Sequence, residues 1–235
     1  MPTRDELFAA YDPPDRTRRR VRMNFVMSAD GSATLDGRSG SLGNRTDREL
    51  MHALRAMADV IVIGAGTVRV EGYGGVGVDA EAVAWRRERT LAEQPRLAVV
   101  SRALRLAPGD SVFTAAEVPP VVVTCAEAPA SRREALADVA EVVVCGEHTV
   151  DLAAMLATFA DRGWTQVLCE GGPHLFGSLL DAGLVDEVCL TLAPRFAGGD
   201  AGRIVQDASE RDRRFSLVHA LTDDEGFVFL RYAAG

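Results

Sequence analysis

Two glycine-rich turns, each directly after an apolar run, hold the residues best suited to chemistry in this chain. Gly64–Thr67 follows the run Val60–Ile63, and Glu170–Pro173 follows Gln166–Cys169. Glycine lets the backbone come close to a ligand, and the free N–H groups at the start of a following helix attract an anion. Pro173 suits the first helical position, because the N–H that it lacks would be unpaired there. The turns therefore predict a phosphate-bearing cofactor, a phosphate-bearing substrate, or both.

Two carboxylates stand at the ends of expected strands. Glu170 lies beside a helix start at a strand end, where open α/β sheets bind ligands, and it could accept hydrogen bonds from a ligand ring or hydroxyl. The alternative is an acid that simply caps the helix. Asp30 follows the strand Val21–Met27 and precedes Gly31, a pair that is also typical of an ordinary turn.

Composition excludes several kinds of chemistry. All 26 basic residues are arginine, so lysine Schiff bases and the lysine of a P-loop are excluded, and arginine, backbone N–H groups and hydroxyls must bind any phosphate. The net charge of −8 argues against nucleic acid or an anionic membrane as partner. The four cysteines lack metal-ligand spacing, so we expect no metal and a reducing compartment. With no signal peptide and no membrane-spanning run, we expect a cytoplasmic protein.

The alternation of apolar strands and helices predicts an α/β fold with a mostly parallel central sheet flanked by helices. Residues 1–20 are polar and proline-containing and are interpreted as an N-terminal arm, followed by a single domain over residues 21–235. Thr46 is expected to cap a helix, and Ala80–Glu93 to form a charged surface helix. The extended runs Phe215–Leu221 and Phe227–Tyr232 predict an antiparallel C-terminal hairpin.

Five motifs in register resemble a known family. They are Asn24-Phe-Val-x-Ser28-x-Asp30-Gly31, Gly40-Ser41, His52-Ala-Leu-Arg55, Ile63-Gly-Ala-Gly-Thr67-Val and Glu170-Gly-Gly-x-x-Leu175. Together they are similar to the reductase domain of riboflavin biosynthesis, which has a dihydrofolate-reductase-like fold, and the resemblance covers nearly the whole chain. It implies a homodimeric, NADPH-dependent reductase that transfers a hydride to 5-amino-6-(5-phosphoribosylamino)uracil and converts its ribosyl group to ribityl.

The resemblance also implies roles for individual residues. Asp30 would be catalytic, as a carboxylate that orients the pyrimidine or relays a proton, and Ser41, Arg55 and Glu170 would contact the substrate. Arg55 would bind its phosphate through a bidentate contact. The residues expected at the NADPH site are Met27, Gly64, Gly66, Thr67, Glu71, Ser101, Gly171, Gly172, Pro173, His174, Leu175 and Phe176. Ser101 and Arg102 are the candidates for the NADPH 2′-phosphate.

Departures from the family pattern keep other functions open. Gly43 replaces an expected tryptophan, Glu71 replaces an aspartate, and an arginine expected to bind the substrate phosphate is missing from the loop Gly72–Gly77. One alternative is a paralogue on the same fold that reduces dihydrofolate or another pterin or pyrimidine. The other is a non-catalytic nucleotide-binding protein.

Overall fold

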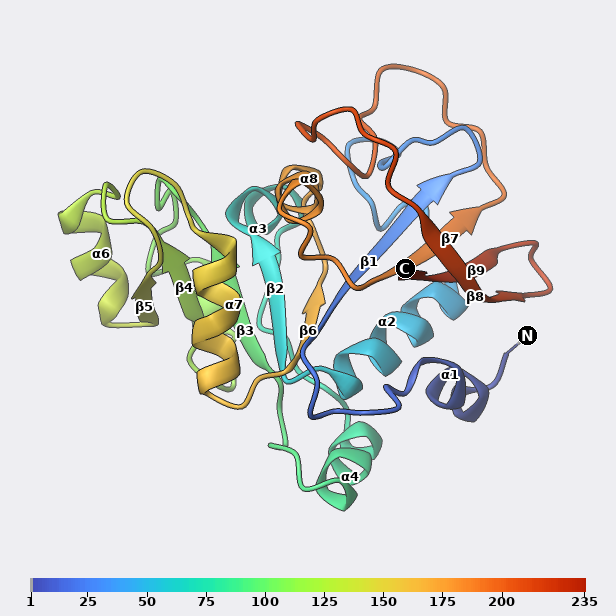
Figure 1. The fold of residues 1–235 in the computed structure, drawn as a ribbon, viewed down its shortest axis with the longest axis horizontal. Coiled ribbons are helices and arrows are strands. Elements are labelled where there is room, and N and C mark those ends of the chain that lie inside the picture. The colour runs from blue at the N-terminus through green and yellow to red at the C-terminus, as the bar shows by residue number, and fades with distance from the viewer. Residues whose placement is uncertain (1) are drawn as a thin grey trace.

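A nine-stranded sheet forms the middle of the molecule, shown in Figure 1 as a computed structural model that describes residues 2–235. Its strand order is β5-β4-β3-β2-β6-β1-β7-β9-β8. The strands from β1 to β7 are parallel, whereas β9 runs antiparallel to β7 and to β8. This confirms the mostly parallel sheet and the C-terminal hairpin. The strands are β1 (Arg20–Ser28), β2 (Val60–Gly64), β3 (Arg96–Val100), β4 (Val121–Thr124), β5 (Glu141–Val144), β6 (Gln166–Cys169), β7 (Glu187–Ala193), β8 (Phe215–Thr222) and β9 (Val228–Ala234).

Helices cover both faces of the sheet because the central strands are apolar on both sides. In β2, Ile61 and Ile63 pack in the cluster that contains α2, while Val60 and Val62 pack in the cluster that contains α7 and α8. The helices are α1 (Arg4–Tyr11), α2 (Arg45–Met57), α3 (Ala65–Glu71), α4 (Ala80–Glu88), α5 (Ser111–Thr114), α6 (Ala130–Ala137), α7 (Leu152–Asp161) and α8 (Pro173–Asp181). None of the helices described for residues 2–235 is long and apolar enough to cross a bilayer.

The N-terminal segment contains a helix that the sequence did not indicate. In α1, Leu7 and Tyr11 are fully buried in the core beside α2, whereas Arg18 and Arg19 are exposed. A second difference concerns the start of α2. Its cap is Asn44, whose side chain accepts from the Asp47 N–H, so the capping role predicted for Thr46 is wrong.

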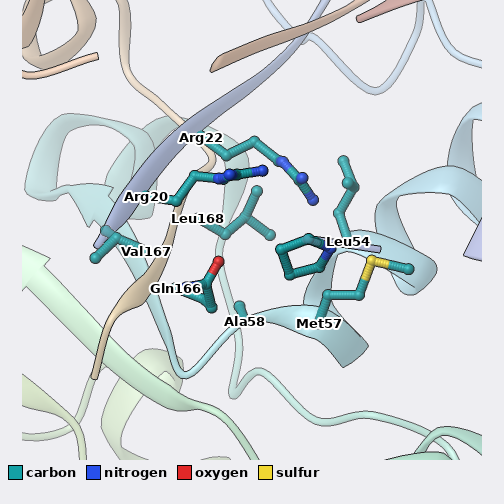
Figure 2. Close-up of a pocket in the computed structure, with 9 residues that line it drawn as sticks. Arg20, Arg22, Leu54, Met57, Ala58, Gln166, Val167 and Leu168 are labelled. Carbon is teal, nitrogen blue, oxygen red and sulfur yellow. The ribbon is translucent and has the colours of Figure 1, made fainter. Parts of the chain in front are cut away.

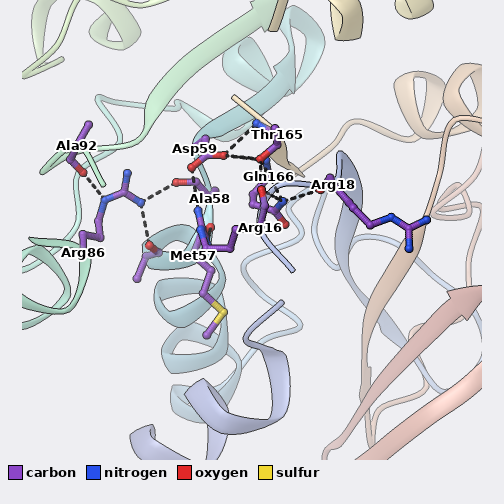
Figure 3. Close-up of polar contacts among 10 residues, drawn as sticks. Arg16, Arg18, Met57, Ala58, Asp59, Arg86, Ala92, Thr165 and Gln166 are labelled. Carbon is purple, nitrogen blue, oxygen red and sulfur yellow. Dashed lines mark hydrogen bonds and ion pairs between the residues drawn. The ribbon is translucent and has the colours of Figure 1, made fainter. Parts of the chain in front are cut away.

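The predicted surface helix over Ala80–Glu93 is also wrong in part, because α4 ends at Glu88 and Arg86 is buried. The chain turns back at Thr90, which has a φ of 58°. The Arg86 guanidinium donates to the carbonyl oxygens of Ala56, Ala58 and Ala92 at 2.6 to 2.8 Å (Figure 3). Burial lowers the pKa of Arg86 to about 10, so the side chain stays charged at neutral pH and ties α4 to the end of α2.

A cluster of four charges holds β1, β7 and β9 together. Glu187 on β7 pairs with Arg20, Arg22 and Arg231, each at 2.7 Å, and its side chain is 5% exposed. The adjacent hollow among Arg20, Arg22 and the start of β6 (Figure 2) has a volume of about 10 Å³. Such a volume has room for about one water molecule, so this end of the sheet offers no ligand site there.

Candidate functional site

The two glycine turns lie side by side at the carboxyl edge of the sheet. β2 pairs directly with β6, and the Gly64 N–H donates to the Gly171 carbonyl at 2.8 Å. As a result α3 and α8 start next to each other (Figure 1). Pro173 occupies the first turn of α8 as predicted. Gly171 has a φ of 118°, which only glycine adopts readily.

Position 172 also favours glycine, because the side chain of Thr67 comes close to its backbone. A Cβ on Gly172 would lie 2.8 Å from the Thr67 hydroxyl oxygen. The backbone of one turn thus packs against a side chain of the other, and the two turns form one continuous ledge.

Two cavities meet at this ledge and divide its residues between them. The α2 cavity has a volume of about 400 Å³, and the ledge residues Thr67, Gly171, Gly172 and Pro173 line one side of it. Its other lining residues are Asn24, Phe25, Val26, Ala33, Thr34, Ser39, Gly40, Gly43, Asp47, Arg48, Met51, Arg55, Glu71, Tyr73 and Glu170. The α3–α8 cavity, of about 420 Å³, is lined by Gly64, Ala65, Gly66, Arg69, Val100, Ser101, Arg102, Ala103, Arg105, Thr149, Val150, Leu152, His174, Leu175 and Ser178. A ligand that lies across the ledge would occupy both.

Arg55 and Glu170, both predicted substrate contacts, face each other in the α2 cavity. Arg55 Nε and Nη2 donate to the two carboxylate oxygens of Glu170, each at 2.7 Å, and the Tyr73 hydroxyl donates to Glu170 as well. Burial disfavours the charged guanidinium, but the charge and hydrogen bonds of Glu170 outweigh it and raise the pKa of Arg55. The Arg55 guanidinium, which was expected to bind the substrate phosphate, therefore binds the Glu170 carboxylate in this structure.

The loop before α2 is tied to the end of α3 by another predicted residue. Glu71 lines the α2 cavity and accepts from the N–H and hydroxyl of Ser39 at 3.0 and 2.9 Å. Ser39 and Gly40 line the cavity, but Ser41 is exposed outside its lining, and its carbonyl accepts from Arg195. Ser39 therefore stands where Ser41 was expected.

Asp30 lies apart from the Arg55–Glu170 pair. It lines a third cavity, of about 340 Å³, together with Met27. Its carboxylate accepts from the Ser28 hydroxyl and from the N–H groups of Ala197 and Gly198 at 3.1 and 2.8 Å. The Ser28 hydroxyl, followed by these N–H groups, lowers the pKa of Asp30 to about 2. The group is therefore ionised at neutral pH and has no proton to give.

Of the remaining residues predicted to bind the cofactor, some line the α3–α8 cavity and one packs in the core behind it. Gly64, Gly66, His174 and Leu175 line the α3–α8 cavity. Phe176 lines neither cavity at the ledge; it is 2% exposed and stacks on Phe25 with ring centroids 5.0 Å apart.

Positive charge gathers in the α3–α8 cavity around the predicted pair Ser101 and Arg102. Arg69, Arg102 and Arg105 line the cavity and are exposed, and none of them forms an ion pair among residues 2–235. Ser101 is buried, and its hydroxyl accepts from the Leu104 N–H at 3.0 Å. Arginines without a carboxylate partner suit the phosphates of a dinucleotide.

Asp47 and Arg48 were not predicted as site residues, but both line the α2 cavity from the first turn of α2. A signal was present, because Asp47, Met51 and Arg55 recur every four residues and all three line the cavity. Residues at this spacing share one face of a helix. Starting from Arg55, the periodicity points back to Asp47.

This fold, with its ledge and paired cavities, defines a reductase domain of the dihydrofolate-reductase-like class. Residues 19–229 match the family model described as the RibD C-terminal domain. The chain belongs to that family and is a pyrimidine reductase of riboflavin biosynthesis. The family uses a nicotinamide dinucleotide as its reductant.

Individual relatives agree with this assignment. A 2,5-diamino-6-ribosylamino-4(3H)-pyrimidinone 5′-phosphate reductase of Methanothermobacter thermautotrophicus is 31% identical over 198 residues, which cover 84% of this chain and 88% of that protein. The riboflavin biosynthesis protein RibD of Mycobacterium tuberculosis is 32% identical over 76% of this chain, but the match spans only 43% of RibD. A pyrimidine reductase-like protein of Corynebacterium diphtheriae superposes with a TM-score of 0.89 at 28% identity and covers 100% of this chain and 99% of its own.

Proposed function

We propose that this chain is an NADPH-dependent reductase of a 6-(5-phosphoribosylamino)pyrimidine in riboflavin biosynthesis. The observation that carries the proposal is the meeting of an arginine-lined cavity and a cavity with paired acidic and basic groups at one glycine ledge. When bound, NADPH supplies a hydride from nicotinamide C4 to C1′ of the opened, imine form of the sugar. The ledge would carry the cofactor backbone, with its adenosine end in the α3–α8 cavity.

The residues of the α2 cavity have distinct parts in this proposal. Arg55 and Tyr73 hold the Glu170 carboxylate in one orientation, and Glu170 accepts hydrogen bonds from the substrate beside the ledge. Arg48 is exposed at the cavity and forms no ion pair among the described residues, so it is the arginine proposed to bind the substrate phosphate. Holding the reacting carbons in contact and excluding water are the protein's main contributions to hydride transfer.

The function is tested by following NADPH oxidation with three substrates in parallel. These are the 2,5-diaminopyrimidinone phosphate named for the archaeal relative, its deaminated uracil counterpart and dihydrofolate. Turnover of either phosphoribosylamino compound and none of dihydrofolate is the expected result. Turnover of dihydrofolate alone, or of none of the three, would contradict the proposal.

The preference for NADPH over NADH is expected to depend on Arg102. Removing one charged partner of a phosphate in Arg102→Ala should weaken NADPH binding by about 10- to 100-fold. NADH, which has no 2′-phosphate, should bind the variant and the wild type equally well. Titration calorimetry with both dinucleotides measures this, and Arg89→Ala, an exposed arginine stacked on Trp85, is the control. Equal losses for the two dinucleotides would rule out a 2′-phosphate contact.

Asp30 is proposed to act by holding the segment around Ala197 and Gly198 over the end of β1. In Asp30→Asn an amide NH₂ faces one of these N–H donors, so the segment should shift and turnover should fall by about one to two orders of magnitude. NADPH affinity should stay nearly unchanged. Steady-state kinetics and dinucleotide titration measure the two effects, and unchanged turnover would remove Asp30 from the reaction.

A homodimer is proposed to form along the edge strand β8. Leu217 and Val218 on this strand are 54% and 50% exposed, and β8 has a sheet neighbour on one side only. An unpaired apolar edge is suited to pair with a second copy. The molar mass in solution tests the proposal: we expect a dimer for the wild type and a monomer for Leu217→Glu, and a monomeric wild type would refute it.

A further inference from the structure

Tyr73 lines the α2 cavity from the loop Gly72–Gly77, in which this chain departs from the family pattern. Gly72 ends α3 with a φ of 66°, and the Tyr73 N–H donates to the Val68 carbonyl at 3.1 Å. The Ser111 hydroxyl donates to the Tyr73 carbonyl at 2.9 Å. These contacts fix the backbone of Tyr73, so the departure from the pattern places a phenol at a defined point of the cavity.

The Tyr73 hydroxyl belongs to a cluster of a phenol, a cation and a carboxylate beside the glycine ledge. Arg55 Nη2 donates to the Tyr73 oxygen at 2.6 Å and to Glu170 Oε2 at 2.7 Å. The Tyr73 hydroxyl donates to the same Glu170 oxygen, and Glu170 directly precedes the ledge residues Gly171 and Gly172. A guanidinium in contact with a phenol stabilises the phenolate form. The cluster is therefore suited to release a proton next to the ledge.

The other ionisable groups that line the α2 cavity are less suited to give a proton there. Arginine keeps its proton in proteins, and none of the four histidines, all of them in the described part of the chain, lines the cavity. Glu71 accepts from the N–H and hydroxyl of Ser39. Burial raises the pKa of Asp47, but this acid precedes Arg55 by about 12 Å along α2. Tyr73 is thus the proton donor of the cavity that lies with Arg55 and Glu170.

We propose that Tyr73 is the general acid that opens the ribose ring of the substrate. This inference rests on the proposed function, because it names the source of the proton in that reaction. A hydroxyl rotates freely about its C–O bond, so the Tyr73 O–H can turn from Glu170 to the substrate. Its proton goes to the ring oxygen O4′ as the C1′–O4′ bond breaks, and O4′ keeps the electron pair of that bond. The lone pair of the exocyclic nitrogen forms the C1′=N bond, and C1′ then accepts the hydride.

The charges of the cluster match the charges that arise during this reaction. Ring opening leaves a phenolate on Tyr73 and a positive charge on the C1′=N group of the substrate. Arg55 contacts the phenolate oxygen, and the Glu170 carboxylate, on the same cavity wall, stabilises the positive nitrogen. Hydride addition at C1′ removes the positive charge, and water returns a proton to Tyr73. Each turnover thus consumes one hydride and one proton, and the three side chains end in their initial charge states.

Tyr73→Phe tests the assignment because it removes the hydroxyl but keeps the ring that lies under the Arg55 guanidinium. We measure single turnovers of the phosphoribosylamino substrate with NADPH and with NADPH deuterated at the transferred C4 position, together with steady-state kcat and KM. We expect kcat to fall by about 100-fold or more and KM to change little. The isotope effect of the variant should be close to one, because ring opening is then slower than hydride transfer. A residue that only positioned Glu170 would slow the hydride step itself and leave an isotope effect clearly above one.

The control is Tyr232→Phe, which removes a hydroxyl outside the α2 cavity and should keep wild-type turnover. Thermal unfolding checks that both variants fold, and if Tyr73→Phe does not fold, Tyr73→Leu is measured by the same criteria. A wild-type protein that turns over no phosphoribosylamino compound would overturn the proposed function and this inference together. An active wild type combined with an unchanged kcat in the Tyr73 variant, or with an isotope effect clearly above one in that variant, would overturn the inference alone.

Discussion

A Gly172→Val variant is expected to lose NADPH binding while it keeps its fold. A Cβ at position 172 would lie 2.8 Å from the Thr67 hydroxyl oxygen, and the two valine methyl groups would extend over the ledge where the cofactor backbone must approach. The φ of Gly172 is −87°, which valine tolerates, so the effect is on the surface of the site. Dinucleotide titration should show a rise in Kd of at least about 100-fold.

The control for this variant is another glycine that has open space around it. A Cβ on Gly109 meets nothing within 4 Å, and the residue lies outside both cavities of the ledge. Gly109→Val should therefore bind NADPH like the wild type. Normal binding by a folded Gly172→Val protein would place the cofactor away from the ledge.

Glu187→Gln is expected to destabilise the fold strongly. The substitution keeps the shape of the side chain but leaves Arg22 and Arg231, whose side chains are 7% and 10% exposed, without their carboxylate. Breaking a buried ion pair on one side costs about 3–5 kcal/mol of unfolding free energy. Urea unfolding measures it. Glu141→Gln, which breaks a surface pair with Arg162, is the control and should lose less than about 1 kcal/mol.

The contribution of Glu187 should also depend on pH in one direction. Burial acts to raise its pKa, but the charges and hydrogen bonds of Arg22 and Arg231 outweigh burial and lower the pKa of Glu187 below its ordinary value of 4.5. The stabilisation is therefore complete above that value and is lost as the pH falls through the lower folded pKa. The difference in stability between wild type and Glu187→Gln should shrink in acid, and a constant difference would assign the effect to packing.

Local signals in the sequence predicted the parts of the site that depend on backbone geometry. The strand Gln166–Cys169, the glycines that follow it and the proline at the start of α8 are as expected. A strand end, a residue with positive φ and a helix start each have their own residue preference, so they can be recognised without knowledge of the partners. The same holds for the aspartate at position 151, a preferred cap residue whose side chain accepts from the Ala154 N–H at the start of α7.

Features that depend on distant partners were not predictable in this way. Arg86 is typical of an exposed helical residue, and its burial depends on carbonyl groups of Ala56, Ala58 and Ala92. The opposition of Arg55 and Glu170 joins residues that are 115 positions apart. The family resemblance implied a substrate contact for Ser41, but in the irregular loop before α2 it is Ser39 that lines the cavity. Long-range pairing and irregular loops leave no local pattern in the sequence.

The position of β1 between β6 and β7 also affects how the chain folds during synthesis. This strand is synthesised long before its neighbours on both sides, because Arg20–Met23 pairs with Gln166–Cys169 and Arg22–Ser28 pairs with Glu187–Ala193. On the ribosome, β1 therefore stays unpaired until the segments of β6 and β7 have emerged. Folds with such distant pairing fold slowly and expose aggregation-prone segments meanwhile. Low growth temperatures and a supply of chaperones should thus raise the yield of native enzyme.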